Sequence, residues 1–93
     1  MELSCKAEYA LLALLELATA YHDEQLLQIR QIAAKQNIPE RYLDQILATL
    51  RRGGLIKGIR GAKGGYILAR EPRKITLLDA LRCIEGLDAA PLS

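Results

Sequence analysis

The chain has 93 residues, of which 51% are hydrophobic and 26% charged, and its formal net charge is +2; this length allows one domain, and the composition is that of a globular protein. No stretch approaches the roughly 20 consecutive apolar residues of a membrane-spanning helix. Two cysteines are too few for a disulfide framework, so we expect a cytoplasmic protein with no membrane partner.

The N-terminal segment, from Leu3 to about His22, predicts a long helix. Ser4 suits the N-cap position, because its hydroxyl can accept a hydrogen bond from a free backbone N–H of the first turn. Spacings of three and four residues place one set of apolar side chains on a common helix face. The side chains expected to be buried on this face are Leu11, Leu14, Leu15 and Ala18.

Two further helices are predicted at residues 29–36 and 39–52, joined by a tight turn. Asn37 tolerates the left-handed conformation that ends a helix, and Pro39 suits the first position of the next helix. The glycine pair 53–54 ends the later helix. The apolar side chains expected to pack around the turn are Ile32, Ala33, Ile38, Leu43, Ile46, Leu47 and Leu50. This pattern is that of a helix-turn-helix, although a plain helical hairpin in a bundle gives the same one.

A glycine-rich hairpin follows the third helix. Leu55–Arg60 and Tyr66–Ala69 have strand character, and residues 61–65 form the turn between them. A basic two-stranded hairpin directly after a helix-turn-helix is typical of a wing. We therefore predict a wing at residues 55–69, which favours the helix-turn-helix over the helical hairpin.

A fourth helix is predicted over residues 75–85, after a polar link at residues 70–74. Thr76 and Asp79 have the spacing of the N-cap and N3 residues of a near capping box. The side chains expected on the buried side of this helix are Leu78, Leu81, Cys83 and Ile84. Gly86 is expected to end the helix.

The predicted fold class is mainly α with a small β-hairpin. It is a winged helix-turn-helix with a three-helix core, a two-stranded wing and a following helix. One domain is expected over residues 1–86. Residues 87–93 are expected to be a tail, the start of a linker to a dimerisation helix in a longer chain.

Positive charge is concentrated in residues 51–74. This segment holds eight of the 13 basic residues and one of the 11 acidic ones, a net charge of +7; the remaining five basic and ten acidic residues give −5. Such asymmetry indicates a polyanionic partner, whereas a solvated basic face is the alternative. The position of the segment, directly after a helix-turn-helix, favours double-stranded DNA.

The third helix is predicted to be the recognition helix in the major groove. The guanidinium of Arg41 matches guanine O6 and N7, and the amide of Gln45 matches adenine N6 and N7. The carboxylate of Asp44 can accept from cytosine N4. Arg51 and Arg52 lie late on the helix and are expected to contact phosphate. For each of these side chains, an ordinary exposed polar residue is the alternative interpretation.

The wing is predicted to approach the minor groove. Arg60 stands at the base of the turn, where a guanidinium would be attracted by the negative potential of a narrow minor groove. Gly61 allows the backbone close to the DNA, and Lys63 is expected at phosphate. A purely structural hairpin needs the same glycines, so this signal alone does not separate the two interpretations.

Three segments carry a resemblance to a known family. They are EYALLALLELA at residues 8–18, IRQIAAKQNIPERYLDQILATLRRGGL at 29–55 and RGAKGGYILAREPRKITLLDAL at 60–81. They closely resemble the Rrf family of bacterial winged helix-turn-helix transcription regulators, the IscR, NsrR and CymR type. The resemblance implies a dimeric cytoplasmic regulator, expected to act as a repressor, on a palindromic operator. It implies recognition-helix contacts by Arg41, Tyr42, Asp44 and Gln45, and a minor-groove contact by Arg60.

The cysteines depart from the pattern of the family. Many members carry three cysteines beyond the matched region and bind an iron–sulfur cluster, whereas Cys5 and Cys83 do not match those positions. We therefore expect no metal and no cofactor in this chain, and a cluster only if a longer parent chain supplies cysteines.

DNA binding has three alternatives from other function classes. A winged-helix protein-interaction module that does not bind DNA is the main alternative, and the +7 segment argues against it. RNA binding is disfavoured because few aromatic residues are available for base stacking. An enzyme is not expected, since His22 has no nucleophile or metal partner near it in the sequence.

Overall fold

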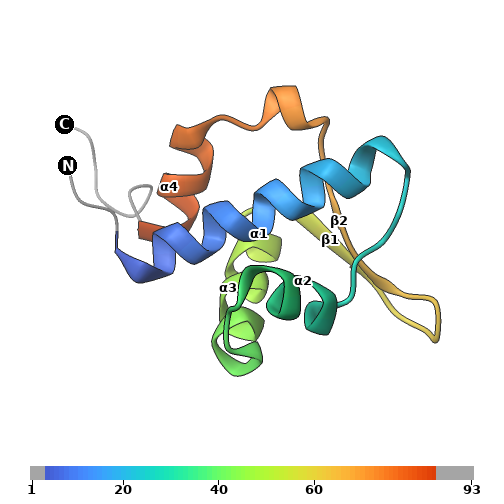
Figure 1. The fold of residues 1–93 in the computed structure, drawn as a ribbon. Helices are drawn as coiled ribbons and strands as arrows, with labels where there is room; N and C mark the ends of the chain where they lie inside the picture. Colours follow the sequence, from blue (N-terminus) through green and yellow to red (C-terminus); the bar gives the residue numbers. More distant parts are fainter. Residues whose placement is uncertain (1–3, 86–93) are drawn as a thin grey trace, which may run out of the picture.

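The structure is a computed structural model and describes residues 4–85. Within that range it contains four α-helices, one 3₁₀ turn and a two-stranded antiparallel sheet (Figure 1). In chain order the elements are α1 (Cys5–His22), α2 (Ile29–Gln36), α3 (Glu40–Arg52), β1 (Ile56–Ile59), β2 (Gly65–Leu68), η1 (Pro72–Lys74) and α4 (Leu77–Glu85). The predicted order and type of the elements are confirmed. The expected end of α4 at Gly86 and the tail at 87–93 lie outside the described residues.

Ser4 and Asn37 have the helix-capping roles that the sequence predicted. The Oγ atom of Ser4 accepts from Ala7 N at 3.1 Å and caps α1. Asn37 ends α2 in the left-handed conformation at φ 58°. Pro39 is extended at ψ 130°, so α3 begins one residue later than predicted, at Glu40. The residues expected to pack around the turn are all buried: Ile32, Ala33, Ile38, Leu43, Ile46, Leu47 and Leu50.

The buried face of α1 differs from the prediction. Leu14 is buried as expected, and Leu11 and Ala18 are half-buried, but Leu15 is 60% exposed. The core face of this helix is formed instead by Ala7, Ala10, Ala13, Leu14, Leu17 and Ala20. Alanine leaves room for α3 and α4 to pack closely against α1. The buried face is therefore set by small residues, and Leu15 lies outside it.

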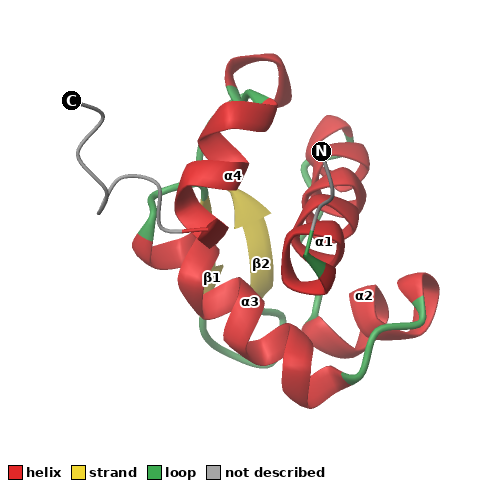
Figure 2. Ribbon diagram, turned by 90° about the vertical axis from the view of Figure 1, so that its left-hand side faces the viewer, coloured by secondary structure: helices red, strands yellow, loops and turns green. Residues whose placement is uncertain are grey.

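The wing strands are paired in one antiparallel register. Ile56 lies opposite Leu68, and Ile59 lies opposite Gly65. β1 is therefore shorter than the predicted strand at residues 55–60, whereas β2 has the predicted length but begins and ends one residue earlier than residues 66–69. β1 packs against α3 and β2 against α1, which places the sheet beside the helical core (Figure 2). A residue outside the named strands extends the pairing, because Leu27 N donates to Tyr66 O at 3.0 Å and Tyr66 N donates to Leu27 O at 2.7 Å. The linker before α2 is thereby fixed to the wing.

The fourth helix has the predicted N-terminal cap, but one of the leucines that we expected to be buried lies on its exposed side. Asp79 N donates to Thr76 Oγ1, and Thr76 N donates to Asp79 Oδ2, both at 3.0 Å. The backbone N–H of Thr76 lowers the pKa of the Asp79 carboxyl, because this bond favours the charged form. α4 begins at Leu77 rather than at residue 75. It buries Ala80 and Ile84, whereas Leu78 points the opposite way and is 50% exposed, so the prediction that Leu78 is buried is wrong.

None of the helices among residues 4–85 is both long enough and apolar enough to cross a bilayer.

Candidate nucleic-acid interface

The exposed side of α3 carries the side chains predicted to read DNA. Its buried side faces the core through four apolar residues, Leu43, Ile46, Leu47 and Leu50. Arg41, Gln45 and Arg52 follow one another at helical spacing along the opposite side, and all three are exposed. Asp44 and Arg51 are also exposed and lie together on the side of that row towards Glu40. The helix therefore presents a continuous polar surface of the kind that enters a major groove.

A hollow of about 670 Å³ lies at the start of α3. One of its lining residues, Lys6, was not among the site residues predicted from the sequence. Arg41, Tyr42 and Gln45 line it together with Lys6 from α1. The ring of Tyr42 is half-buried and meets Tyr9 edge to face, with ring centroids 5.3 Å apart. Packing thus fixes the orientation of Tyr42. Lys6 lies 35 residues before Arg41, and only the packing of α1 against α3 brings the two together.

A second groove, of about 730 Å³, separates α2 and α3 from the wing. Arg60 and Gly61 line it from the wing, and Arg51 lines it from α3. Arg30, at the start of α2, also lines it and was not among the predicted site residues. Glu40 lines both hollows, so they meet at the N-terminus of α3. Neither hollow is lined by Asp44, Arg52 or Lys63.

The wing turn holds its cations away from the core. Arg60 directly follows β1, and Gly64 N donates to Gly61 O at 2.9 Å to close the turn. Gly61 has φ 117°, a conformation that favours glycine. Arg60, Gly61 and Lys63 are all exposed. The turn therefore presents two cations on a short loop, as a groove-entering wing requires.

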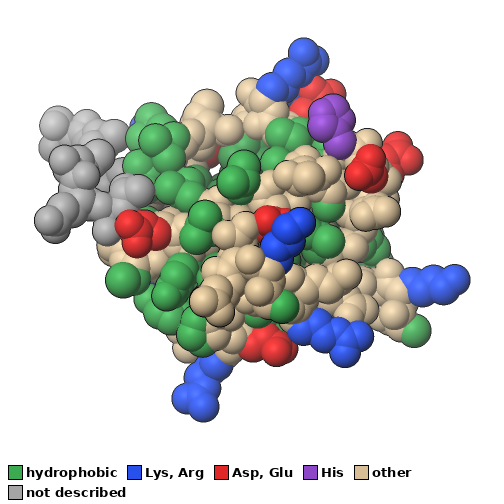
Figure 3. Space-filling view, viewed as in Figure 1, with side chains coloured by type: hydrophobic (Ala, Val, Ile, Leu, Met, Phe, Trp, Pro, Cys, Tyr) green, Lys and Arg blue, Asp and Glu red, His purple; other side chains and the backbone are tan. Residues whose placement is uncertain are grey.

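The cations of α3 and the wing are not neutralised by neighbouring carboxylates. Within residues 4–85, ion pairs join Lys35 to Glu16 at 3.8 Å and Arg73 to Glu71 at 2.8 Å, and neither pair reaches α3 or the wing. Figure 3 shows Lys and Arg side chains projecting along the lower and right-hand edges of the molecule, near α2, α3 and the wing. Hydrophobic side chains gather on the left, over α1 and α4. The surface thus offers positive charge that is available to an external anion.

The described residues do not fit an iron–sulfur cluster or another metal centre. Cys5 is exposed at the start of α1, whereas Cys83 is half-buried on α4, with Sγ donating to Thr49 O at 3.2 Å. Within residues 4–85, no three histidine, cysteine or acidic side chains gather at one point.

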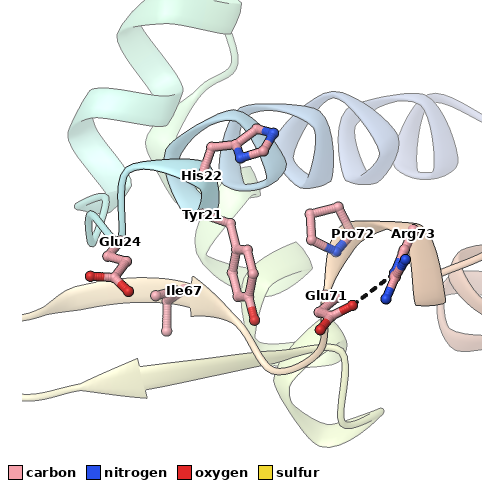
Figure 4. A pocket seen from close by; sticks show the side chains of 7 residues that line it. All are labelled: Tyr21, His22, Glu24, Ile67, Glu71, Pro72 and Arg73. Carbon is pink, nitrogen blue, oxygen red and sulfur yellow. Dashed lines mark hydrogen bonds and ion pairs between the residues drawn. The ribbon is translucent and has the colours of Figure 1, made fainter.

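A third hollow, of about 790 Å³, lies behind the wing at the end of α1. Its lining includes Tyr21, His22 and Glu24, and the Glu71–Arg73 ion pair stands at its other side (Figure 4). None of the predicted site residues lines it, so it is separate from the candidate interface.

The helix-turn-helix, the two-stranded hairpin after it and the exposed cations on both define the class of this protein: it is a winged helix-turn-helix protein. Residues 3–92 match the Rrf2 family, described as iron-dependent transcriptional regulators, and the chain belongs to this family. The family description agrees with the expectation that the chain is not an enzyme.

Named relatives and solved structures support this membership. The chain is 44% identical over 86 residues to the HTH-type transcriptional regulator CymR of Bacillus subtilis, covering 92% of this chain and 62% of the relative. It is 37% identical over 86 residues to the HTH-type transcriptional regulator IscR of Cereibacter sphaeroides, covering 91% of this chain and 56% of the relative. The chain thus spans a little over half the length of these curated relatives.

The solved structures agree with the fold. The structure of CymR, the global cysteine regulator of B. subtilis, superposes with a TM-score of 0.86 at 43% identity, covering 92% of this chain and 66% of that one. The structure of T. potens IscR also gives a TM-score of 0.86, at 44% identity, covering 94% of this chain and 63% of that one.

Proposed function

We propose that this chain binds double-stranded DNA in a sequence-specific manner and acts as a cytoplasmic transcription regulator, a repressor at its operator. The observation that carries the proposal is the row of exposed cations on α3 and the wing, which have no carboxylate partner among residues 4–85. Unpaired Arg and Lys side chains release counterions from DNA when they bind phosphate, which provides affinity.

The two elements have different tasks. α3 enters the major groove, where Arg41, Asp44 and Gln45 reach base edges. Tyr42 offers a hydroxyl from a ring held by Tyr9, which suits a positioning contact. The wing enters the adjacent minor groove through Arg60. The remaining predicted contacts go to the sugar–phosphate backbone, which sets the register of α3: Arg51, Arg52, Gly61 and Lys63.

We further propose that two copies act together on a palindromic operator. Leu15 and Leu77 are about 60% exposed and line one apolar hollow between α1 and α4, and Leu78 is exposed on the same helix. No residue of α3 lines this hollow, so a second copy can cover it while both recognition helices stay free. A symmetric pair would place two recognition helices on two half-sites of opposite orientation.

Selection from a random duplex library tests the proposal directly. We expect enrichment of an inverted repeat whose half-sites are separated by about one helical turn. Recovery of a single half-site would contradict the dimer but not DNA binding. Absence of any enriched sequence, together with equal affinity for all duplexes, would contradict sequence-specific regulation.

A further inference from the structure

The groove between the N-terminus of α2 and the wing has the position of a DNA backbone site. When α3 lies in a major groove and the wing lies in the adjacent minor groove, one sugar–phosphate backbone must pass between them. The groove of about 730 Å³ occupies that position, and three arginines from three elements line it. We propose that this groove holds the DNA backbone and that Arg30 binds a phosphate in it. This inference rests on the proposed DNA binding and adds a contact that lies outside the basic segment 51–74.

The side chain of Arg30 is oriented for an anion. Its Nε donates to Gln28 Oε1 at 3.0 Å, which holds the guanidinium over the start of α2. An arginine has five N–H donors, so the four on the terminal nitrogens remain, enough for a two-pronged contact with a phosphate. Arg30 is exposed and forms no ion pair with a described carboxylate. Gln28 is therefore a positioning residue, and Arg30 is the binding residue.

The two walls of the groove are held at a fixed separation. Leu27, directly before the Gln28 cap, is bound to Tyr66 of β2 by the two backbone hydrogen bonds of 2.7 and 3.0 Å. Gly65 permits this approach, because a Cβ atom there would lie 2.7 Å from Leu27 O. The start of α2 therefore keeps its place relative to the wing, and the site needs little rearrangement to receive a phosphate.

The opposite wall carries a second cation. A Cβ atom placed on Gly58 would lie 3.9 Å from Arg51 Nη1, so the Arg51 guanidinium reaches from α3 to β1. Arg60 lines the same groove from the wing. Glu40 is the one carboxylate among the described lining residues, and it repels phosphate. The balance is three cations against one anion, which favours a backbone contact on the side of Arg30 and Arg51.

The salt dependence of binding tests this contact, with Lys35→Gln as the matched control. Lys35 lies on the same helix as Arg30 and carries the same charge, but it pairs with Glu16 of α1 and does not line the groove. The affinities of wild type, Arg30→Gln, Arg30→Lys and Lys35→Gln are measured on a selected duplex and on an unrelated one. Each phosphate contact contributes a slope of about −0.9 in log affinity against log salt, or about 3.5-fold between 50 and 200 mM salt.

We expect Arg30→Gln to lose this one-phosphate increment on both duplexes and to leave base preference unchanged. Arg30→Lys should restore most of the slope, and Lys35→Gln should match the wild type. An unchanged slope in Arg30→Gln would overturn the contact while leaving DNA binding intact. A changed base preference would also overturn it, since Arg30 would then read bases. Failure of the wild type to bind either duplex would overturn the proposed function itself.

Glu40→Gln provides an independent check in the opposite direction. Removing the carboxylate from the groove should strengthen binding to both duplexes, because a repulsion next to the backbone is lost. A lack of any gain would contradict the placement of the backbone in this groove.

Discussion

The face formed by α3 and the wing differs from the face formed by α1 and α4. The first exposes cations such as Arg41, Arg51 and Arg60, which form no ion pair within residues 4–85, whereas the second exposes Leu15 and Leu77 around an apolar hollow. Exposed leucine side chains are stabilised when an apolar surface covers them, whereas exposed arginine side chains are stabilised little by an apolar partner. The two faces are therefore suited to different partners, a polyanion on one side and an apolar protein surface on the other.

The two faces meet at a tight joint. Gly53 is the C-cap residue of α3, and the thiol of Cys83 from α4 packs so closely against it that a Cβ atom on residue 53 would overlap with the Sγ atom. Cys83 also donates to Thr49 O of α3 at 3.2 Å. The recognition helix and the apolar face thus share a boundary that allows no additional atom. A substitution at Gly53 or Cys83 should therefore affect the packing beneath both faces, whereas a substitution of an exposed residue should affect only the face on which it lies.

Arg60→Ala should have the largest effect on the cationic face. We expect the affinity for a selected duplex to fall about 10- to 100-fold, because a guanidinium is lost from the minor groove. Fluorescence anisotropy at fixed salt measures this change, and the thermal midpoint should stay the same because the side chain is exposed. Unchanged affinity would refute the minor-groove role.

Gly53→Ala tests the joint. The added methyl group would overlap with Cys83 Sγ, so we expect a loss of about 1–2 kcal/mol in the free energy of unfolding. In a Cys83→Ala background the overlap disappears and most of that loss should vanish. Urea unfolding of the four proteins of this double-mutant cycle measures the coupling. Additive effects would show that the two residues do not compete for space.

Asp44→Ala should change specificity more than affinity. A carboxylate that accepts from cytosine N4 disfavours other bases, so its removal should relax preference at one operator position. Overall affinity should change less than about 10-fold, the equivalent of 1.4 kcal/mol. A binding selection repeated with the variant measures the base profile, and an unaltered profile at every position would count against this role.

Asp79→Asn should have the smallest effect, on the cap of α4. The pKa of Asp79 is lowered in the folded state, so the charged carboxylate contributes stability above its unfolded pKa of about 3.9 and loses it as pH falls through the folded value. We expect the variant to melt slightly below the wild type at pH 7 and the difference to close below about pH 4. Thermal melts across this range measure it. A difference that persists at low pH would point to a cause other than charge.

Local signals were sufficient to predict most of the fold. Ser4, Asn37 and the Thr76–Asp79 pair act within a few residues of themselves, and each has the predicted role. Leu15 and Leu78 are the failures. Both are leucines at helical spacing, yet exposure was decided by which side of the helix meets its neighbours. In α1 that side is lined mainly by alanines, which are less hydrophobic than leucine and therefore contribute less to a hydrophobic pattern in the sequence.

The candidate site was predictable in part for the same reason. Arg41, Gln45 and Arg60 follow from helical spacing and from the glycine-rich turn. Lys6 and Arg30 do not, because only long-range packing places them beside the other residues of the candidate site. Arg30 is brought to the wing by the Leu27–Tyr66 pairing, which joins residues 39 positions apart. No local pattern specifies such a pairing.

The slope of log affinity against log salt for the wild-type chain on a selected duplex is the most direct test of DNA binding by α3 and the wing. If α3, α2 and the wing neutralise several phosphates, the slope is several times −0.9. We expect such a steep loss of affinity with rising salt for the wild type, and a slope less steep by about 0.9 for Arg30→Gln. A slope near zero would contradict DNA binding by this cationic face.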